Sequence, residues 1–444
     1  MNRMAGGAAL VIAVAAQLLA QAPRYDLVLK GGHVIDPANS INEVRDVAVQ
    51  AGKIAAVEKA IPPSNARKSV DATGFYVTPG LVDIHVHIGH GGAPLNWFEP
   101  SADSHIPPLG ILADTVLNSG VTTIVDAGSS GAKTFLREKQ EVIDHSRVRV
   151  LALLNIVTAG MNSGKEQDVS EMDPQLCADT IHQFRDVIVG VKTAHYWTAP
   201  PWDQAHPPWA AVDRAEECGR LANVPVMFDF WPRPPERSYA ELILKKMRPG
   251  DIHTHVFAQQ FPILEANGKL NPILLEARRR GVIFDVGHGQ GSFWFRNAVP
   301  AVKQGFIPDS FSTDLHTGNI NGAVVNLITT MSKFLAMGVP LEDVIRRATV
   351  NPAQEIHRPE LGTLSVGREA DIAVLELRKG RFGYTDCGNA RMVGNVMLVN
   401  RMTVRAGRIV YDPGGISRVD WEKAPRQYFT TPKLSSDPPA RTEQ

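Results

Sequence analysis

The chain is poor in cysteine and has no surplus of either charge. Its 444 residues include three cysteines, Cys177, Cys218 and Cys387, which are spaced too widely to form a metal-binding pattern. The 46 basic and 46 acidic residues form no basic stripe or acidic tail, which argues against nucleic acid or an anionic membrane as a partner. We expect the cysteines to be small buried side chains, and a disulfide between two of them stays open for an oxidising compartment.

Long hydrophobic runs are also lacking, except near the N-terminus. Residues 8–20 are almost wholly apolar, Arg3 precedes them, and the tripeptide AQA at 20–22 has the small-x-small form of a cleavage site. The run is shorter than the roughly 20 residues that cross a bilayer comfortably. We therefore expect residues 1–22 to be a Sec-type signal peptide, leaving a periplasmic or extracellular protein with no membrane partner; an uncleaved anchor is the alternative.

Both ends of the remaining chain consist of short strand-like runs separated by turns. At the N-terminal end these runs cover residues 25–30, 33–36, 44–50 and 53–58, and at the C-terminal end 372–377, 397–400, 403–406 and 409–411. Neither set can bury much surface alone. We expect residues 23–76 and 364–415 to form one small β-sandwich, and residues 416–444, rich in Pro, Ser, Thr and charge, to be an irregular tail.

Residues 77–363 alternate between strand-like and helix-like stretches. The predicted strands are 81–87, 121–127, 148–157, 187–194, 224–230, 251–257, 282–287 and 310–316, and the helical stretches include 209–222, 271–281 and 321–337. This alternation predicts an α/β protein with a (β/α)8 barrel of the TIM type. A doubly wound open sheet is less favoured because no Gly-rich dinucleotide or phosphate loop follows any strand.

The first predicted strand carries polar side chains in an apolar run. His85 and His87 lie two positions apart, so a strand places them on one face with Cα atoms about 7 Å apart, and Asp83 shares that face. Such groups are costly to bury unless something satisfies them, and a metal ion does so. By itself, the His-x-His pattern is weak evidence for a metal, because it fits a partly solvated or hydrogen-bonded histidine pair better.

Polar side chains also follow most of the other predicted strands. They include Lys192 and His195, Asp229, His253 and His255, Asp285 and His288, and Asp314 and His316. The carboxyl ends of barrel strands meet at one mouth, where barrel enzymes hold their active sites. The convergence of so many ionisable groups therefore predicts a metal site there.

Several of these segments carry a family resemblance. They are PGLVDIHVH at 79–87, VGVK at 189–192, RPGDIHTH at 248–255, FDVGHG at 284–289, FSTDLH at 311–316 and GTLSVGREADI at 362–372. Together they resemble the amidohydrolase superfamily, and within it the dihydroorotase-like branch that contains the amidohydrolase/deacetylase metallohydrolases. The resemblance covers nearly the whole chain after residue 22 and is specific for mechanism rather than for substrate.

The resemblance implies two divalent ions, usually zinc. One ion would be held by His85, His87 and Asp314, and a carbamate on Lys192 would bridge both. Imidazole and carboxylate suit zinc, whereas an ammonium group cannot bind a cation. A plain Lys192 paired with an aspartate is the alternative. On the sixth strand, His253 and His255 share a predicted face, and the family's Thr-His pattern favours His255 as ligand to the second ion.

The chain departs from the family pattern at the fifth strand. Asp229 stands where the family usually has a histidine. We expect Asp229 to be an oxygen ligand of the second ion, which would weaken that ion as a Lewis acid and favour harder metals such as manganese there. The alternative is that the second position is empty and Asp229 binds substrate or a proton.

The same resemblance implies a mechanism. A water held between the ions would be the nucleophile, and Asp314 would take its proton and pass it to the leaving group. His288 would stabilise the oxyanion, although a loop histidine bonded to backbone is an equal alternative. Asp83, one alternation deeper than His85, would support the ligands from behind.

Most of the tryptophans fall in the predicted loops at the barrel mouth. These are Trp97, Trp197, Trp202, Trp209, Trp231 and Trp294. Aromatic side chains give a large contact area at low entropy cost, so we expect a bulky, partly apolar substrate bound by His195, Trp197, Arg233 and His288. Arg233, Arg237 or Arg296 would meet a carboxylate. A lid or a contact in a homo-oligomer is the alternative for these loops.

The residues predict a secreted metal-dependent hydrolase of an amide or ester bond in a small molecule. A deacetylase or an N-acyl amino acid or dipeptide amidase is the leading hypothesis. A cyclic amidase of the dihydroorotase or hydantoinase type is the first alternative. It is less favoured because a secreted enzyme would rarely meet a pyrimidine intermediate. A non-catalytic metal-stabilised binding protein is the second. Only the departure at Asp229 supports it, and a binding scaffold needs no proton carrier such as Asp314.

Overall fold

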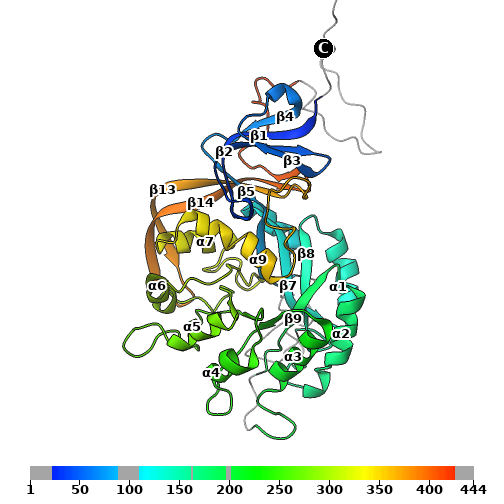
Figure 1. The fold of residues 1–444 in the computed structure, drawn as a ribbon, viewed down its shortest axis with the longest axis vertical. Helices are drawn as coiled ribbons and strands as arrows, with labels where there is room; N and C mark the ends of the chain where they lie inside the picture. The colour runs from blue at the N-terminus through cyan, green and yellow to red at the C-terminus, as the bar shows by residue number, and fades with distance from the viewer. Residues whose placement is uncertain (1–22, 89–109, 162–163, 197–201, 426–444) are drawn as a thin grey trace, which may run out of the picture.

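The computed structural model describes residues 23–88, 110–161, 164–196 and 202–425, which build two sheets stacked along the long axis of the molecule (Figure 1). The predicted signal peptide, Trp97, Trp197 and the end of the predicted tail lie outside these residues. Within the described chain, no helix combines the length and the apolar character that crossing a membrane requires.

The smaller sheet contains strands from both ends of the chain. Its hydrogen-bonded order is β15-β14-β13-β5-β1-β2-β3, with β4 beside β1. The strands are β1 (Tyr25–Asp36), β2 (Ile41–Gln50), β3 (Lys53–Glu58), β4 (Ala66–Asp71), β5 (Tyr76–Pro79), β13 (Ile372–Thr385), β14 (Arg391–Arg405) and β15 (Arg408–Tyr411). They form one connected sheet around a core that includes Leu29, Val47, Val77 and Ile372. The two packed layers of a sandwich are not confirmed.

Two predicted interruptions in this sheet are absent. Strand β1 runs through Gly31 and Gly32, where the sequence suggests a turn, because both halves pair with β2 and only the register shifts there. Gly31 has a φ of 67°, so the glycine pair forms a bulge rather than a turn. Strand β14 is also continuous, and the long β13–β14 hairpin extends beside the barrel to α7, where Leu398 N–H donates to Ser332 Oγ (3.0 Å; Figure 1).

The larger sheet is parallel throughout, in the order β12-β11-β10-β9-β8-β7-β6. Its strands are β6 (Leu81–Val86), β7 (Val121–Gly131), β8 (Arg149–Asn155), β9 (Ile188–Lys192), β10 (Val226–Phe228), β11 (Ile252–His253) and β12 (Ile283–Phe284). Every residue of β6, β9 and β10 is buried. Such continuous burial is typical of parallel strands covered on both faces.

The eighth predicted strand, residues 310–316, is not a regular strand. It bridges both edges of the parallel sheet instead, pairing Ser310 with Asp285 and Leu315 with Val86. Asp314 has a φ of 51°, a left-handed conformation that breaks the extended backbone. The segment therefore closes the curled sheet without the ladder of a strand.

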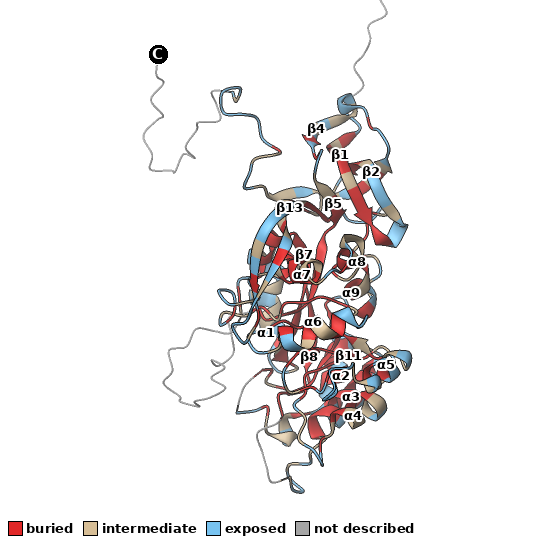
Figure 2. Cartoon of the chain, turned by 90° about the vertical axis from the view of Figure 1, so that its left-hand side faces the viewer, coloured by how far each residue is buried: buried red, intermediate tan, exposed pale blue. Residues whose placement is uncertain are grey.

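The helices pack against the parallel sheet and bury their inner faces (Figure 2). They are α1 (Phe135–Glu141), α2 (Pro174–Gln183), α3 (Ala210–Ala222), α4 (Tyr239–Glu241), α5 (Pro272–Arg279), α6 (Phe295–Lys303), α7 (Leu327–Ala336), α8 (Leu341–Arg346) and α9 (Val350–Glu355). Helices α3, α5 and α7 correspond to predicted helical stretches, although α7 begins later than expected. This arrangement brings the carboxyl ends of the parallel strands together at one end of the barrel.

Candidate metal centre

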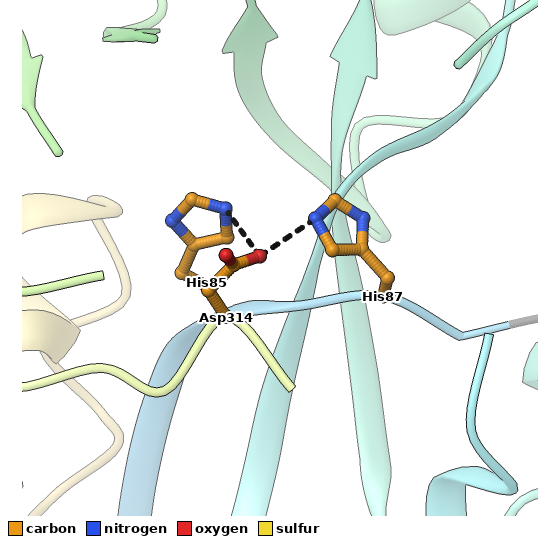
Figure 3. Close-up of side chains that lie close together, drawn as sticks. All are labelled: His85, His87 and Asp314. Atoms are coloured by element: carbon orange, nitrogen blue, oxygen red, sulfur yellow. Dashed lines mark ion pairs between the residues drawn. The ribbon is translucent and has the colours of Figure 1, made fainter. Parts of the chain in front are cut away.

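Three of the predicted metal ligands lie together, and the two histidines among them face one carboxylate oxygen of the third, Asp314 (Figure 3). His85 Nε2 lies 3.4 Å and His87 Nε2 lies 3.0 Å from Asp314 Oδ1. Each residue offers one ligand atom, and these atoms all lie within 4.8 Å of one another. Burial lowers the pKa of His85 well below its ordinary value, so the ring is neutral, as a metal ligand must be. The three residues could hold one metal ion.

The backbone at Asp314 is held in its left-handed conformation by Asp83. Thr313 Oγ1 donates to Asp83 Oδ2 (2.6 Å), and the Thr313 N–H donates to Asp83 Oδ1 (3.1 Å). Burial raises the pKa of Asp83 to about 7. A non-glycine residue with a positive φ costs energy and persists only where its surroundings fix it. Asp83 therefore ties the segment of Asp314 to β6, as the sequence predicted for a supporting residue.

A second cluster adjoins the first. Asp229 Oδ2 lies 3.5 Å from Lys192 Nζ and 3.2 Å from His255 Nε2. The ring centroids of His85 and His255 are 4.9 Å apart, which places the two clusters side by side. The structure thus brings together His85, His87, Lys192, Asp229, His255 and Asp314, the six residues that the sequence predicted as ligands.

Two buried nitrogen atoms in these clusters make no hydrogen bond to any described residue. His85 Nε2 and Lys192 Nζ have no hydrogen-bond partner in the described structure, and both side chains are 0% exposed. A buried polar atom without a partner is rare and costs on the order of 1–3 kcal/mol. A metal bound to His85 Nε2 would supply the partner that this atom lacks. A carbamate formed on Lys192 Nζ would turn the ammonium group into a metal ligand.

Glycines make room for this arrangement. A Cβ on Gly128 would lie 2.8 Å from Lys192 Cβ, and one on Gly289 would lie 2.5 Å from Asp314 Oδ2. A Cβ on Gly287 would meet Thr254 Oγ1 at 2.3 Å. Real Cβ atoms do not approach so closely, so any larger residue at these positions would displace the clusters.

The fifth-strand aspartate is surrounded by nitrogen atoms. Besides Lys192 and His255, His195 Nε2 lies 2.9 Å from Asp229 Oδ2. Although burial favours the neutral acid, the charges of His255, His195 and Lys192 lower the pKa of Asp229 well below its usual range. Asp229 is therefore ionised, which suits an oxygen ligand.

His195 is held between two carboxylates. Its Nδ1 lies 3.2 Å from Glu166 Oε2, and its Nε2 faces Asp229. Burial opposes protonation of His195, but the charges of Glu166 and Asp229 outweigh it and raise its pKa to about 9. Both ring nitrogens thus have protein partners, and the predicted contact of His195 with substrate stays a prediction.

The two histidines near β11 do not share a face, contrary to expectation. The His253 ring packs against Tyr239, Phe261 and Phe284, whereas His255 faces Asp229. The strand ends at His253, and His255 has a φ of 60°. This turn breaks the alternation of a strand, so the rule used to pair the two residues does not apply.

His288 lies in a buried cluster behind the mouth. Lys333 Nζ lies 2.5 Å from His288 Nε2, His288 Nδ1 lies 3.0 Å from the Gly289 carbonyl oxygen, and Phe293 stacks on the ring. Burial lowers the pKa of Lys333 to about 7. The geometry matches the alternative of a loop histidine bonded to backbone, and contact of His288 with an oxyanion stays a prediction. The sequence signal that could have revealed this cluster is Lys333, a lysine in the otherwise apolar helix α7.

Two arginines of the fifth loop are joined to each other by backbone hydrogen bonds. Arg233 and Arg237 exchange backbone hydrogen bonds of 2.8 and 2.9 Å. The Arg237 guanidinium is buried, donates to the Tyr196 carbonyl oxygen and lies 4.4 Å from the Phe230 ring centre. The Arg237 guanidinium therefore has partners within the protein. Arg233 is half-buried, and its role in substrate binding stays a prediction. Trp197 lies outside the described residues.

Four residues hold the histidine ligands from behind, and of these only Asp285 was among the polar residues singled out from the sequence. Thr254 Oγ1 lies 2.9 Å from His85 Nδ1, and Ser129 Oγ lies 3.2 Å from His87 Nδ1. These hydroxyl groups bond in turn to Asp285 and Asp126. Asp126 could have been found by the same sign as Asp285, since it is a carboxylate near the carboxyl end of an apolar predicted strand.

The sequence matches that of known proteins over most of its length. The amidohydrolase family matches residues 76–201 and 295–410. A deacetylase of Agrobacterium fabrum is 33% identical over 350 residues, which cover 76% of this chain and 79% of that protein.

Solved structures resemble the fold closely. The crystal structure of an adenine deaminase has a TM-score of 0.74 and 29% sequence identity, over 87% of this chain and 100% of that chain. The crystal structure of a dihydroorotase has a TM-score of 0.72 and 28% identity, over 87% of this chain and 99% of that chain. The shared fold and the His85, His87 and Asp314 group support a metal centre of the type that this family uses.

Proposed function

Because the chain belongs to the amidohydrolase family and is thereby a hydrolase acting on carbon–nitrogen bonds, we propose that it is a deacetylase or an N-acyl amino acid or dipeptide amidase with two metal ions. One observation carries the proposal. Two buried ligand clusters lie side by side, and His85 Nε2 and Lys192 Nζ in them have no hydrogen-bond partner in the described structure. The similarity to a deacetylase over most of the chain supports the bond type.

The residues divide into two ligand sets. His85, His87 and Asp314 would hold one ion, and Asp229 and His255 the other, with a carbamate on Lys192 between them. Imidazole nitrogen and carboxylate oxygen suit zinc, and the carboxylate at Asp229 admits manganese at the second position. When bound, the ions supply Lewis acidity, which lowers the pKa of a water and polarises the substrate carbonyl.

Asp314 is the residue that would move the proton. Its Oδ1 faces both histidines, whereas its Oδ2 lies against Gly289. Although burial favours the acid form, the three neighbouring imidazole groups of His85, His87 and His255 lower the pKa of Asp314 below its ordinary value, so the residue starts as a base. Asp314 Oδ2 would accept the proton of the attacking water and donate it to the leaving nitrogen.

A cyclic amidase of the dihydroorotase type is the second candidate. The similarity to a dihydroorotase structure favours it. The tryptophans of the predicted mouth loops favour the acyclic substrate instead, because a side chain such as Trp231, which is 38% exposed, would offer more apolar surface than a small cyclic ureide needs.

The test is hydrolysis of a panel of N-acetyl amino acids, N-acyl dipeptides, aryl acetates, dihydroorotate and hydantoins by the zinc-loaded protein, with and without chelator. We expect chelator-sensitive release of the acyl group and little ring opening. Metal analysis of the same sample should give two ions per chain, one for the group of His85, His87 and Asp314 and one for the second cluster around Asp229. Ring opening as the main activity would favour the second candidate, and one ion per chain at saturation would exclude the dinuclear site.

We also propose that the protein is secreted. The support is the apolar run at residues 8–20, preceded by Arg3 and followed by small residues at 20 and 22. Expression of the full chain in a bacterium, followed by fractionation and N-terminal sequencing, should find a mature protein that begins at Pro23 outside the cytoplasm. An intact N-terminus in the cytoplasmic fraction would contradict secretion.

A further inference from the structure

The imidazole ligands share one feature that the metal centre alone does not require. In each ring, Nδ1 is bonded within the protein while Nε2 faces the site. His255 Nδ1 lies 2.6 Å from the Gly287 carbonyl oxygen, a group that only accepts hydrogen bonds. His255 Nδ1 therefore carries a proton, and its Nε2, which faces Asp229, is the ring nitrogen that a metal would bind.

His85 and His87 bond to hydroxyl groups instead, and a hydroxyl can donate or accept. Thr254 Oγ1, bonded to His85 Nδ1, donates its one proton to Asp285 Oδ2 at 2.8 Å. Ser129 Oγ, bonded to His87 Nδ1, donates its proton to Asp126 Oδ1 at 2.6 Å. Because each hydroxyl has a single hydrogen, only its lone pairs remain for the histidine.

The direction of these hydroxyl groups is fixed by the carboxylates behind them. Asp285 also accepts from Ser310 Oγ (2.9 Å) and from Ser312 Oγ (2.6 Å). Asp126 also accepts from the N–H groups of Ile88 (3.0 Å) and Ser129 (2.9 Å). Both carboxylates are almost fully buried and surrounded by donors, so reversing one hydroxyl would leave a buried acceptor without its proton.

We propose that Thr254 with Asp285, and Ser129 with Asp126, are two positioning pairs that fix His85 and His87 as Nδ1–H tautomers. Each pair thereby keeps the Nε2 lone pair directed at the metal position. The value of this arrangement for metal binding rests on the proposed function, whereas the tautomers themselves do not. The pairs come from different parts of the barrel: Ser129 and Asp126 lie on β7 beside β6, and Thr254 and Asp285 follow β11 and β12.

The rival explanation is that these hydroxyl groups only fill hydrogen bonds in a buried region. Ser310 provides the matched control, because it donates to the same Asp285 carboxylate but not to a histidine. Thr254→Val removes the hydroxyl and keeps the shape of the side chain, and Thr254→Ser restores the hydroxyl. Ser129→Ala tests the second pair at a less buried site, so a folding failure of Thr254→Val does not end the test.

The first experiment measures tautomers in the metal-free protein, by nitrogen NMR of samples labelled only in histidine, with His85→Gln used to assign the His85 signals. We expect the Nδ1–H form at His85 in the wild type, in Thr254→Ser and in Ser310→Ala. In Thr254→Val we expect a mixture of tautomers or the Nε2–H form. Ser129→Ala should show the same change at His87. Retention of the Nδ1–H form in both hydroxyl-free variants would overturn the proposal.

The second experiment measures zinc affinity by competition with a chromogenic chelator at fixed pH. Loss of a partner behind a histidine ligand typically weakens metal binding about 10–100-fold, so we expect losses of that size for Thr254→Val and Ser129→Ala and less than about threefold for the two controls. An equal loss in Ser310→Ala would reveal a merely structural effect and overturn the proposal. If the wild type binds no zinc, the proposed metal centre fails, and the tautomer measurement still decides the inference.

Discussion

At the scale of single residues, the site depends on how the backbone positions a few side chains. Asp314 shows this most clearly, since its backbone has a positive φ and one of its oxygens faces two histidines. A left-handed aspartate is retained where its position matters more than its strain energy. On the proposed function, the carboxylate would have two tasks, ligation through Oδ1 and proton transfer through Oδ2, which a substitution can separate.

Asp314→Asn should separate the two tasks. The amide keeps an oxygen for the metal but cannot carry a proton, so we expect most of the bound metal to remain while turnover falls by at least about 10²–10⁴-fold. Metal analysis and the rate of acyl release on one sample check this. Asp420→Asn, in an exposed part of the chain, should leave both unchanged, and near-normal turnover of Asp314→Asn would exclude its role as proton carrier.

Gly128 allows a test of the room that Lys192 needs. Gly128→Ala would place a Cβ 2.8 Å from Lys192 Cβ at a φ of 84°, whereas Gly250→Ala has a similar φ of 90° and no atom within 4 Å. Both should lose about 1–2 kcal/mol of unfolding free energy from backbone strain. Only Gly128→Ala should also lose metal at the second position. Denaturant unfolding and metal analysis measure the two effects, and full metal content in Gly128→Ala would show that the clash is relieved elsewhere.

At the scale of elements, parallel strands overlap seven of the eight stretches that the hydrophobic pattern predicted. The pattern could not predict where the backbone leaves the extended conformation. The positive φ values of His255 and Asp314 follow no sequence pattern, yet they decide which side chains face the site. For the same reason the sequence missed that His253 turns away from the site and that residues 310–316 bridge two strands without forming one.

Helix α9 offers a pH-dependent test at a residue outside the ligand clusters. Its last residue, Glu355, is buried, and burial, together with the charges of Asp285 and Asp309, raises its pKa well above the ordinary value of 4.5. The folded protein thus binds this proton more tightly than the unfolded chain does. The contribution of Glu355 to stability is complete below about pH 4.5 and is lost as the pH rises through the folded pKa.

Glu355→Gln keeps the shape of the side chain and removes the ionisation. We expect the variant to gain stability relative to the wild type as the pH rises from about 4.5, by up to about 1.4 kcal/mol per pH unit within that window. Urea unfolding at several pH values measures the difference. Exposed Glu422→Gln should show no such trend, and a constant difference for Glu355→Gln would mean that the carboxyl group is ionised throughout.

At the scale of the whole molecule, contacts between distant parts of the sequence complete the barrel. The tip of the β13–β14 hairpin reaches α6, where Asp386 Oδ2 accepts the N–H of Phe295 (2.9 Å), and Cys387 lies beside His288, 99 residues earlier. The sequence predicted that both ends join in one small module. It could not predict that the hairpin also supports the loop after β12, because nothing in its local pattern specifies that partner.

The metal centre should also couple folding to ion binding, because its ligands come from strands all around the barrel. An ion that binds only the folded state at 100 times its dissociation constant adds about 2.7 kcal/mol to the unfolding free energy. Removal of metal should therefore lower the melting temperature by several degrees, and zinc should restore it. His85→Gln removes a ligand that is itself fully buried, so its melting temperature should hardly respond to chelator or zinc. If wild type and variant respond equally, the ion acts elsewhere on the protein, and the cluster of His85, His87 and Asp314 is not the site that links metal binding to stability.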